Sequence, residues 1–211
     1  MKIEVNDFTK IISKAKVLEN INICLEGGNI YGIIGRNGSG KTMFLRMLCG
    51  LILPTSGMVK VDGKVLGKDI SFPENLGILL EKPSFLPNLT GYENLQMLSD
   101  IRNITPNEKI QSLMNLFELD WKSKKTFNKY SLGMKQKLGI IQAIMENQQI
   151  IILDEPFNAL DEVSVEKLRK ILESLRDEGK LIVMTSHNKE DIDLLCDHTY
   201  TIVNGKMEAE N

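Results

Sequence analysis

The 211-residue sequence has little cysteine, few aromatic residues and no long apolar run. Its three cysteines, Cys24, Cys49 and Cys196, are far apart and form no C-x-x-C pair, which excludes a disulfide framework or a zinc site of the usual spacing. We expect reduced, buried thiols, as in a cytoplasmic protein. No apolar run approaches the about 18 residues that a membrane-spanning helix needs, and the N-terminus lacks the apolar region of a signal peptide. If the protein serves a membrane, it is expected to do so through a partner.

The charge is nearly balanced, with 26 basic and 28 acidic residues and a formal net charge of −2. This balance argues against a protein that binds nucleic acid by neutralising phosphates. The densest basic run contains Lys122, Lys124, Lys125 and Lys129, and we interpret it as a solvated face. The charged fraction of 26% and hydrophobic fraction of 42% are typical of a globular protein, here long enough to bury a substantial core.

One glycine-rich stretch, G-R-N-G-S-G-K-T, matches the pattern G-x-x-x-x-G-K-[ST]. It follows an apolar segment typical of a buried strand and precedes a helical segment that ends at Gly50, which is the context that the pattern requires. Both flanks disfavour the alternative of a ligand-free turn. Glycines let the backbone fold closely around a polyphosphate, with its N–H groups pointing inward at a helix N-terminus. We predict phosphate binding by Gly35, Arg36, Asn37, Gly38, Ser39, Gly40, Lys41 and Thr42.

The last two residues of this loop add specific chemistry. The ammonium of Lys41 is expected to reach the β- and γ-phosphates as a point charge. The hydroxyl of Thr42 is placed to ligate a magnesium ion shared with those phosphates.

The hydrophobic pattern predicts an α/β chain with a helical insertion. Strands are expected over residues 2–5, 17–25, 30–34, 58–61, 65–66, 76–80, 149–153, 181–185 and 200–203. Helices are expected over 43–49, 93–103, 106–119, 132–147, 163–178 and 191–196. Thr105 is predicted to cap the second of the three consecutive helices, with Pro106 at its first position and Glu108 completing a capping box. We predict a single domain over 1–211, with an α/β core in 1–83 and 148–211 and a helical subdomain in 84–147.

Two further groups of polar residues follow buried strands. Asp154 and Glu155 end an apolar strand, where one carboxylate is expected to hold magnesium and the other to polarise an attacking water. Taken alone, the pair also fits an ordinary exposed strand end. His187 ends the next strand, at the sheet edge where open α/β sheets bind ligands, so we predict a catalytic role in preference to a surface or capping role.

The segment Y-S-L-G-M-K-Q at residues 130–136 resembles the L-S-G-G-Q signature of ABC (ATP-binding cassette) transporters. It lies between the helical segment and the acidic strand end, as in that family, and N-A-L-D at 158–161 resembles the family's D-loop. The whole chain is therefore similar to the nucleotide-binding subunit of an ABC transporter. The resemblance implies a P-loop NTPase core of ABC ATPase type, with an N-terminal antiparallel β-subdomain and an inserted α-helical subdomain.

The resemblance also implies an ATPase that uses ATP and Mg²⁺ in a head-to-tail dimer, a homodimer in our expectation. Its catalytic residues are Glu155, Lys41 and His187, the last matching the family's switch histidine. Ser131 and Gly133 start a helix, so a hydroxyl, free N–H groups and the positive helix end are expected to face a γ-phosphate on the partner subunit. The alternative, that Ser131 only caps its helix, is compatible with this contact.

Several positions depart from the family pattern. Leu132 replaces the first glycine of the signature and Met134 its glutamine. Glu81 stands where the family has the glutamine of its Q-loop, and we interpret it as an additional magnesium ligand at the start of a lever to a membrane partner. Ile12 aligns with the aromatic residue that usually stacks on adenine, which implies weak stacking or stacking supplied elsewhere.

Glu81 and the Y-S-L-G-M form together resemble the branch that exports bacitracin-like and lantibiotic peptides. The function we predict is the ATP-binding subunit that drives a separate permease, peripheral on the inner face of the cell membrane, with no nucleic acid as partner. One alternative is a soluble, non-transport ABC ATPase that acts as a switch on ribosomes or DNA. Relatives of that kind typically have two cassettes or a long coiled-coil insertion, which do not fit in 211 residues. Another alternative is a regulatory binding module that has lost catalysis.

Overall fold

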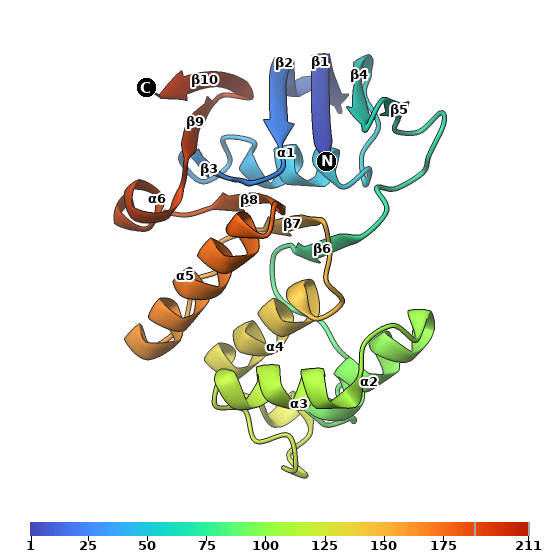
Figure 1. The fold of residues 1–211 in the computed structure, drawn as a ribbon. Coiled ribbons are helices and arrows are strands. Elements are labelled where there is room, and N and C mark those ends of the chain that lie inside the picture. Colours follow the sequence, from blue (N-terminus) through green and yellow to red (C-terminus); the bar gives the residue numbers. More distant parts are fainter. Residues whose placement is uncertain (188, 211) are drawn as a thin grey trace.

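The computed structural model describes residues 1–187 and 189–210, in which two sheets and their helices are stacked in layers (Figure 1). The first sheet is antiparallel, with the strand order β2 (Ala15–Glu26), β1 (Lys2–Ile12), β4 (Ser56–Val61) and β5 (Lys64–Val65). The second has the order β10 (Lys206–Glu210), β9 (His198–Val203), β3 (Asn29–Ile34), β8 (Leu181–Thr185), β7 (Ile150–Leu153) and β6 (Leu76–Leu79). In this second sheet only the pairing of β10 with β9 is antiparallel.

The helices are α1 (Lys41–Leu48), α2 (Gly91–Arg102), α3 (Asn107–Leu116), α4 (Leu132–Ile144), α5 (Glu162–Asp177) and α6 (Lys189–Leu195), with a 3-10 turn, η1, at Phe127–Lys129. Helices lie on both faces of the second sheet, and α2 and α3 lie beyond α4, away from the sheet (Figure 1). Helix α1 lies between the two sheets, whereas α4 and α5 lie on the opposite face (Figure 1). This is the α/β fold that the sequence predicts, with an antiparallel N-terminal sheet and a helical insertion.

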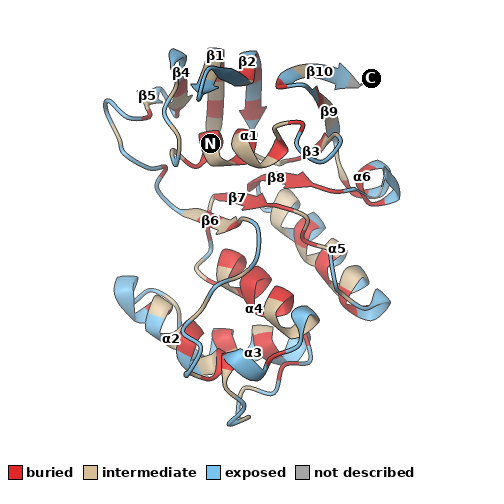
Figure 2. Ribbon diagram, turned by 180° about the vertical axis from the view of Figure 1, so that it is seen from behind, coloured by how far each residue is buried: buried red, intermediate tan, exposed pale blue. Residues whose placement is uncertain are grey.

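The strands of the second sheet are buried on both faces, which explains their continuous apolar sequence. Side chains alternate along β7: Ile150 and Ile152 pack with Phe44 of α1, whereas Ile151 and Leu153 pack with the helices on the far side. Figure 2 shows this burial as a continuous buried run along β7 and β8. The core therefore holds the carboxyl ends of these strands rigidly side by side.

Several sequence predictions need correction. The predicted capping box at Thr105 is wrong, because Pro106 adopts an extended conformation and itself occupies the N-cap of α3, while the Thr105 hydroxyl donates to the carbonyl of Met145. A capping box is present instead at α2, where Thr90 Oγ1 accepts from the N–H of Glu93 and the Glu93 carboxylate accepts from the N–H of Thr90. The difference follows from the backbone of Pro106, which places Glu108 one position too early for a box.

Two smaller predictions also differ from the structure. Strand β1 continues well beyond residue 5, because an irregularity in its register after Val5 lets pairing with β2 resume at Phe8. Cys24 is exposed, whereas Cys49 is buried as expected, and burial raises the pKa of the Cys49 thiol to about 12. Among the described residues, no helix combines the length and hydropathy of a membrane span.

Replacing Gly77 with alanine is expected to lower the free energy of unfolding by at least about 3 kcal/mol. Gly77 lies in β6 against α4, and a Cβ there would be 1.8 Å from the carbonyl oxygen of Ala143. This oxygen cannot easily move away, because it belongs to the backbone of α4. Urea denaturation measures the change. Gly179→Ala is the matched control, because Gly179 has φ +86° with open space around it and reports only the left-handed backbone cost. Equal losses in the two variants would contradict the packing argument.

Candidate functional site

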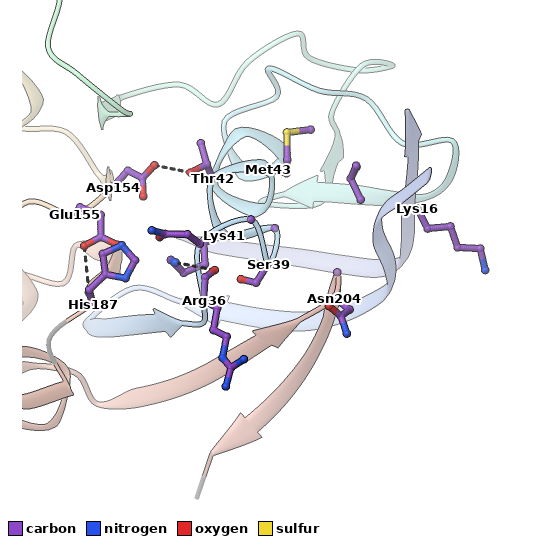
Figure 3. Close-up of a pocket in the computed structure, with 15 residues that line it drawn as sticks. Lys16, Arg36, Ser39, Lys41, Thr42, Met43, Asp154, Glu155, His187 and Asn204 are labelled. Atoms are coloured by element: carbon purple, nitrogen blue, oxygen red, sulfur yellow. Dashed lines mark hydrogen bonds and ion pairs between the residues drawn. The ribbon is translucent and has the colours of Figure 1, made fainter. Parts of the chain in front are cut away.

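A cavity of about 560 Å³ opens at the carboxyl ends of β3, β7 and β8, where the segments following these strands meet (Figure 3). Its lining comprises Lys16, Val17, Arg36, Asn37, Gly38, Ser39, Gly40, Lys41, Thr42, Met43, Asp154, Glu155, His187, Asn204 and Gly205. The fold thus brings residues 36–42 of the predicted phosphate loop together with the three predicted residues that follow β7 and β8. The other predicted site residues, Gly35, Ser131, Gly133 and Glu81, do not line this cavity.

The glycines of the loop make a conformation that other residues would strain. Gly40 is the N-cap of α1 with φ +117°, and it provides no side-chain cap. The N–H groups in the first turn of α1 are therefore without a capping side chain, beside the positive end of the helix. This geometry suits an anionic ligand such as a phosphate group.

Two backbone hydrogen bonds connect the loop to the β9–β10 turn and, through that turn, to β2. The N–H of Gly205, in the turn between β9 and β10, donates to the carbonyl of Ser39 at 2.9 Å. The carbonyl of Gly205 in turn accepts from the N–H of Glu19 on β2 at 2.8 Å. The Ser39 hydroxyl is buried without a hydrogen-bond partner in the described structure, as expected of a group that awaits a ligand.

Lys41 supplies a buried positive charge to the cavity. Its side chain is buried, and Nζ donates to the carbonyl of Gly35 at 2.7 Å and more weakly to that of Arg36 at 3.4 Å. Neutral carbonyls satisfy the ammonium only partly, because they carry no opposite charge to balance it. The ammonium is thus held in place beside the loop, ready for an anionic partner.

Thr42 and Asp154 form an oxygen-rich corner of the cavity. Thr42 Oγ1 donates to Asp154 Oδ2 at 2.8 Å, and Thr185 Oγ1 donates to Asp154 Oδ1 at 2.7 Å. A carboxylate and a hydroxyl are the hard oxygen donors that Mg²⁺ prefers, so these residues fit the predicted ion. Sequence analysis missed Thr185, whose only signal was a polar residue at the end of an otherwise apolar strand.

Glu155 and His187 face each other across the cavity floor (Figure 3). His187 Nε2 lies 3.0 Å from Glu155 Oε1, and the His187 N–H donates to Glu155 Oε2 at 3.1 Å. The N–H of Glu155 donates to Thr185 Oγ1 at 2.8 Å. Burial raises the pKa of the Glu155 carboxyl, although the charges of His187 and Lys41 oppose this effect. The result is a carboxylate of increased basicity directed into the cavity.

The backbone of Glu155 is in the left-handed region, with φ +51°. A non-glycine residue pays a conformational cost there, and such strain tends to persist where the surrounding structure fixes a functional group. Gln136 of α4 contributes to that fixation, because its Nε2 donates to the carbonyls of Glu155 and Pro156 at 3.1 Å each. Helix α4 therefore supports the Glu155 segment from the side of the helical insertion.

No residue of the segment 130–136 lines this cavity. Ser131 is exposed at the N-cap of α4, and its hydroxyl accepts from the N–H of Met134 at 3.3 Å. A Cβ at Gly133 would lie 2.7 Å from the carbonyl of Ala159, so only glycine fits this approach of α4 to the 158–161 segment. The N-terminus of α4 thus packs against the 158–161 segment through Gly133 and leaves Ser131 exposed.

Glu81 takes a different position from the one expected of a ligand in the phosphate cavity. Its carboxylate forms an ion pair with Arg46 of α1 at 2.5 Å. It lines a neighbouring cavity of about 500 Å³, which shares Asp154 and Glu155 with the first. Ile12 is 43% exposed at the end of β1 and is not among the residues that line the phosphate cavity.

Comparison with known proteins places these features in context. Residues 18–158 match the protein family described as ABC transporter. The uncharacterized ABC transporter ATP-binding protein YybJ of Bacillus subtilis is 45% identical over 207 residues, which cover 98% of this chain and 95% of that protein. The bacitracin transport ATP-binding protein BcrA of Bacillus licheniformis is 38% identical, with 99% of this chain and 69% of that protein covered. The lantibiotic transport ATP-binding protein SrtF of Streptococcus pyogenes is 32% identical, with coverage of 99% and 90%.

Solved structures share the fold. An ATP-binding subunit of an ABC transporter superimposes with a TM-score of 0.91 at 25% identity, covering all of this chain and 90% of that chain. The ATP-binding cassette MJ0796, solved as a dimer in a post-hydrolysis state with ADP and Pi, gives a TM-score of 0.87 at 22% identity, with coverage of 99% and 98%. The layered arrangement of sheets and helices is thus that of the ATP-binding cassettes.

Proposed function

The chain belongs to the ABC transporter family as an ATP-binding cassette of the ATPase type, and from this premise we propose that it hydrolyses MgATP to drive a separate permease. The observation that carries the proposal is one cavity in which the phosphate loop, Lys41, Asp154 and Glu155 converge. The alternative of a regulatory module without catalysis is disfavoured, because Glu155 and His187 are paired at 3.0 Å in the same cavity as the phosphate loop.

In this proposal, Lys41 and the first-turn N–H groups of α1 bind the β- and γ-phosphates. Thr42 and Asp154 hold Mg²⁺, which neutralises charge on the phosphate oxygens when it is bound. Glu155 accepts a proton from the attacking water, for which a buried carboxylate with a raised pKa is suited. His187 holds the Glu155 carboxylate in orientation through its two contacts.

We place the second half of the site on another subunit. The N-terminus of α4 begins with the exposed Ser131, and neither Ser131 nor Gly133 lines the cavity of its own chain. In a head-to-tail dimer it would contact the γ-phosphate bound by the partner, where its N–H groups and helix dipole favour negative charge. The dimeric state of MJ0796 supports this arrangement, and a homodimer is the simplest form of it.

The substrate and location follow from the relatives. BcrA and SrtF are named as bacitracin and lantibiotic transport proteins, and this chain shares their sequence over nearly its whole length. We therefore propose that it lies at the cytoplasmic face of the cell membrane, bound to a permease that exports an antimicrobial peptide of this kind.

Affinity purification from detergent-solubilised membranes of the source cells tests this proposal. The bait is a tagged Glu155→Gln protein with MgATP, because it should bind nucleotide without turning it over. The matched control is Lys41→Ala, which should not bind nucleotide. Nucleotide-dependent recovery of a polytopic membrane protein would support the transporter function. Recovery of ribosomal or DNA-bound partners without a membrane protein would contradict it and favour the soluble switch.

Replacing Ser131 with aspartate is expected to abolish MgATP-dependent dimerisation while leaving thermal stability nearly unchanged. Aspartate is as good an N-cap as serine, but its charge would repel the γ-phosphate on the partner subunit. Light scattering on the non-hydrolysing Glu155→Gln background measures dimerisation. Ser131→Ala is the comparison, since it removes the cap at a cost of about 1 kcal/mol without adding charge. Normal dimerisation of the aspartate variant would show that Ser131 only caps its helix.

A further inference from the structure

One partly buried arginine connects the two segments that carry Glu155 and His187. Arg169 lies on α5, and its Nη2 contacts Asp191 Oδ1 of α6 at 2.6 Å. Its Nη1 contacts Glu166 Oε1, one helical turn earlier, at 2.5 Å. Its guanidinium carbon also lies 5.9 Å from the centre of the Phe157 ring, a cation–π distance. The guanidinium thus contacts three different residues, Asp191, Glu166 and Phe157.

Two of these contacts, those with Asp191 and Phe157, connect Arg169 to the segments of His187 and Glu155. Asp191 is only 5% exposed, and its second oxygen, Oδ2, accepts from the hydroxyl of the buried Ser186 at 3.4 Å. Ser186 immediately precedes His187. On the other side, Phe157 follows Glu155 by two residues and packs against the main core cluster. Arg169 is therefore linked to both members of the Glu155–His187 pair.

The contact between Arg169 and Asp191 differs from a surface ion pair because the Asp191 carboxylate is buried. A carboxylate as deeply buried as Asp191 needs a cationic partner, because its desolvation is otherwise uncompensated. If the guanidinium is removed, the start of α6 is expected to shift toward water and to carry the 186–187 segment with it. The phosphate loop, which lies between β3 and α1, receives none of these contacts.

We propose that Arg169 is a positioning residue for hydrolysis, which holds His187 through Asp191 and Glu155 through Phe157 in the geometry that they share. The inference rests on the proposed function, because it requires Glu155 and His187 to act in the hydrolytic step. Arg169 itself does not line the cavity, so its effect is on the rate of hydrolysis and not on nucleotide binding.

The test is ATPase kinetics and nucleotide titration of purified Arg169→Gln protein. We expect kcat to fall about tenfold or more, because small misplacements of reacting groups lower rates strongly. The Kd for ATP is expected to stay within about twofold, since the charged contacts to phosphate are intact. Arg169→Lys, which keeps a cation near Asp191, should recover part of the lost kcat. Asp191→Asn should lower kcat in the same way, and the double variant should lose no more than the larger single loss.

The matched control is Arg176→Gln on the same helix, since Arg176 pairs with Asp177 and Asp197 but not with the Glu155 or His187 segments. Its kcat should match that of the parent. Parental kcat in folded Arg169→Gln protein would overturn the inference. A fall in ATP affinity and melting temperature together with kcat would also overturn it, because it would indicate a purely structural role. If Arg169→Gln does not fold, Arg169→Lys and Asp191→Asn carry the same test.

The proposed catalytic role of Glu155 and the positioning role of Arg169 can be refuted separately. A parent protein without ATPase activity, or Glu155→Gln protein with normal turnover, would refute the proposed catalytic role itself. Loss of turnover in Glu155→Gln together with parental kcat in Arg169→Gln would refute only the positioning role of Arg169.

Discussion

Replacing Lys41 with alanine is expected to weaken ATP binding by about 100-fold, the effect of removing one partner from a desolvated charge contact. The Lys41 side chain is buried beside the loop, and its Nζ is held by the Gly35 carbonyl at 2.7 Å. Alanine removes both the charge that we propose contacts the phosphates and the hydrogen bond to the Gly35 carbonyl. Titration with a fluorescent ATP analogue, followed by competition with ATP, measures the change.

The control for this variant is another buried lysine. Lys180 is 4% exposed and its Nζ donates to Asn147 Oδ1 at 2.7 Å, outside the phosphate cavity. Lys180→Ala is expected to lower stability without changing the Kd for ATP, and this separates a general packing loss from a binding loss. ATP affinity of Lys41→Ala within about threefold of the parent would remove Lys41 from the phosphate site.

Replacing Glu155 with glutamine is expected to lower kcat by about 100-fold or more while the Kd for ATP stays nearly unchanged. Glutamine keeps the shape of the side chain and its ability to contact His187, but it no longer accepts a proton from water at neutral pH. Steady-state phosphate release and nucleotide titration on the same preparation measure the two quantities. Because binding persists, the variant is also expected to accumulate in the MgATP-bound dimer.

An exposed acid on α5 provides the comparison for Glu155. Glu178, the C-cap residue of that helix, is not among the residues that line the cavity, and Glu178→Gln should retain parental kcat. Normal turnover by Glu155→Gln would assign the proton-accepting role to another group. A fall in ATP affinity equal to the fall in kcat would instead indicate that Glu155 acts in nucleotide binding.

The sequence predicted the parts of the site that depend on local order. A strand, a glycine-rich loop and a helix are consecutive in the chain, so the position of Lys41 and Thr42 follows from one stretch of sequence. Asp154 and Glu155 followed from the apolar run of β7, because parallel strands end at a common sheet edge. The α/β fold with its helical insertion was predictable for the same reason, since periodicity distinguishes buried strands from amphipathic helices.

Contacts between distant segments were not predictable in this way. Nothing near Thr185 in sequence shows that its hydroxyl joins Asp154 to the backbone of Glu155. The ion pair of Glu81 with Arg46 likewise depends on how α1 and the end of β6 come together, which the sequence does not show. The failed capping box at Thr105 has a different cause, the backbone geometry of Pro106, to which the residue pattern is insensitive.

The order of strands has a consequence for biosynthesis. Strand β3, which carries the phosphate loop, is flanked by β8 and β9, and both come from the stretch after residue 180. A ribosome needs roughly ten seconds or more to make the intervening chain. The β1–β2 hairpin can form early. Both edges of β3, however, stay unpaired until β8 and β9 have been synthesised. We therefore expect nascent chains stalled before β8 to expose this strand and to be favoured targets of chaperones.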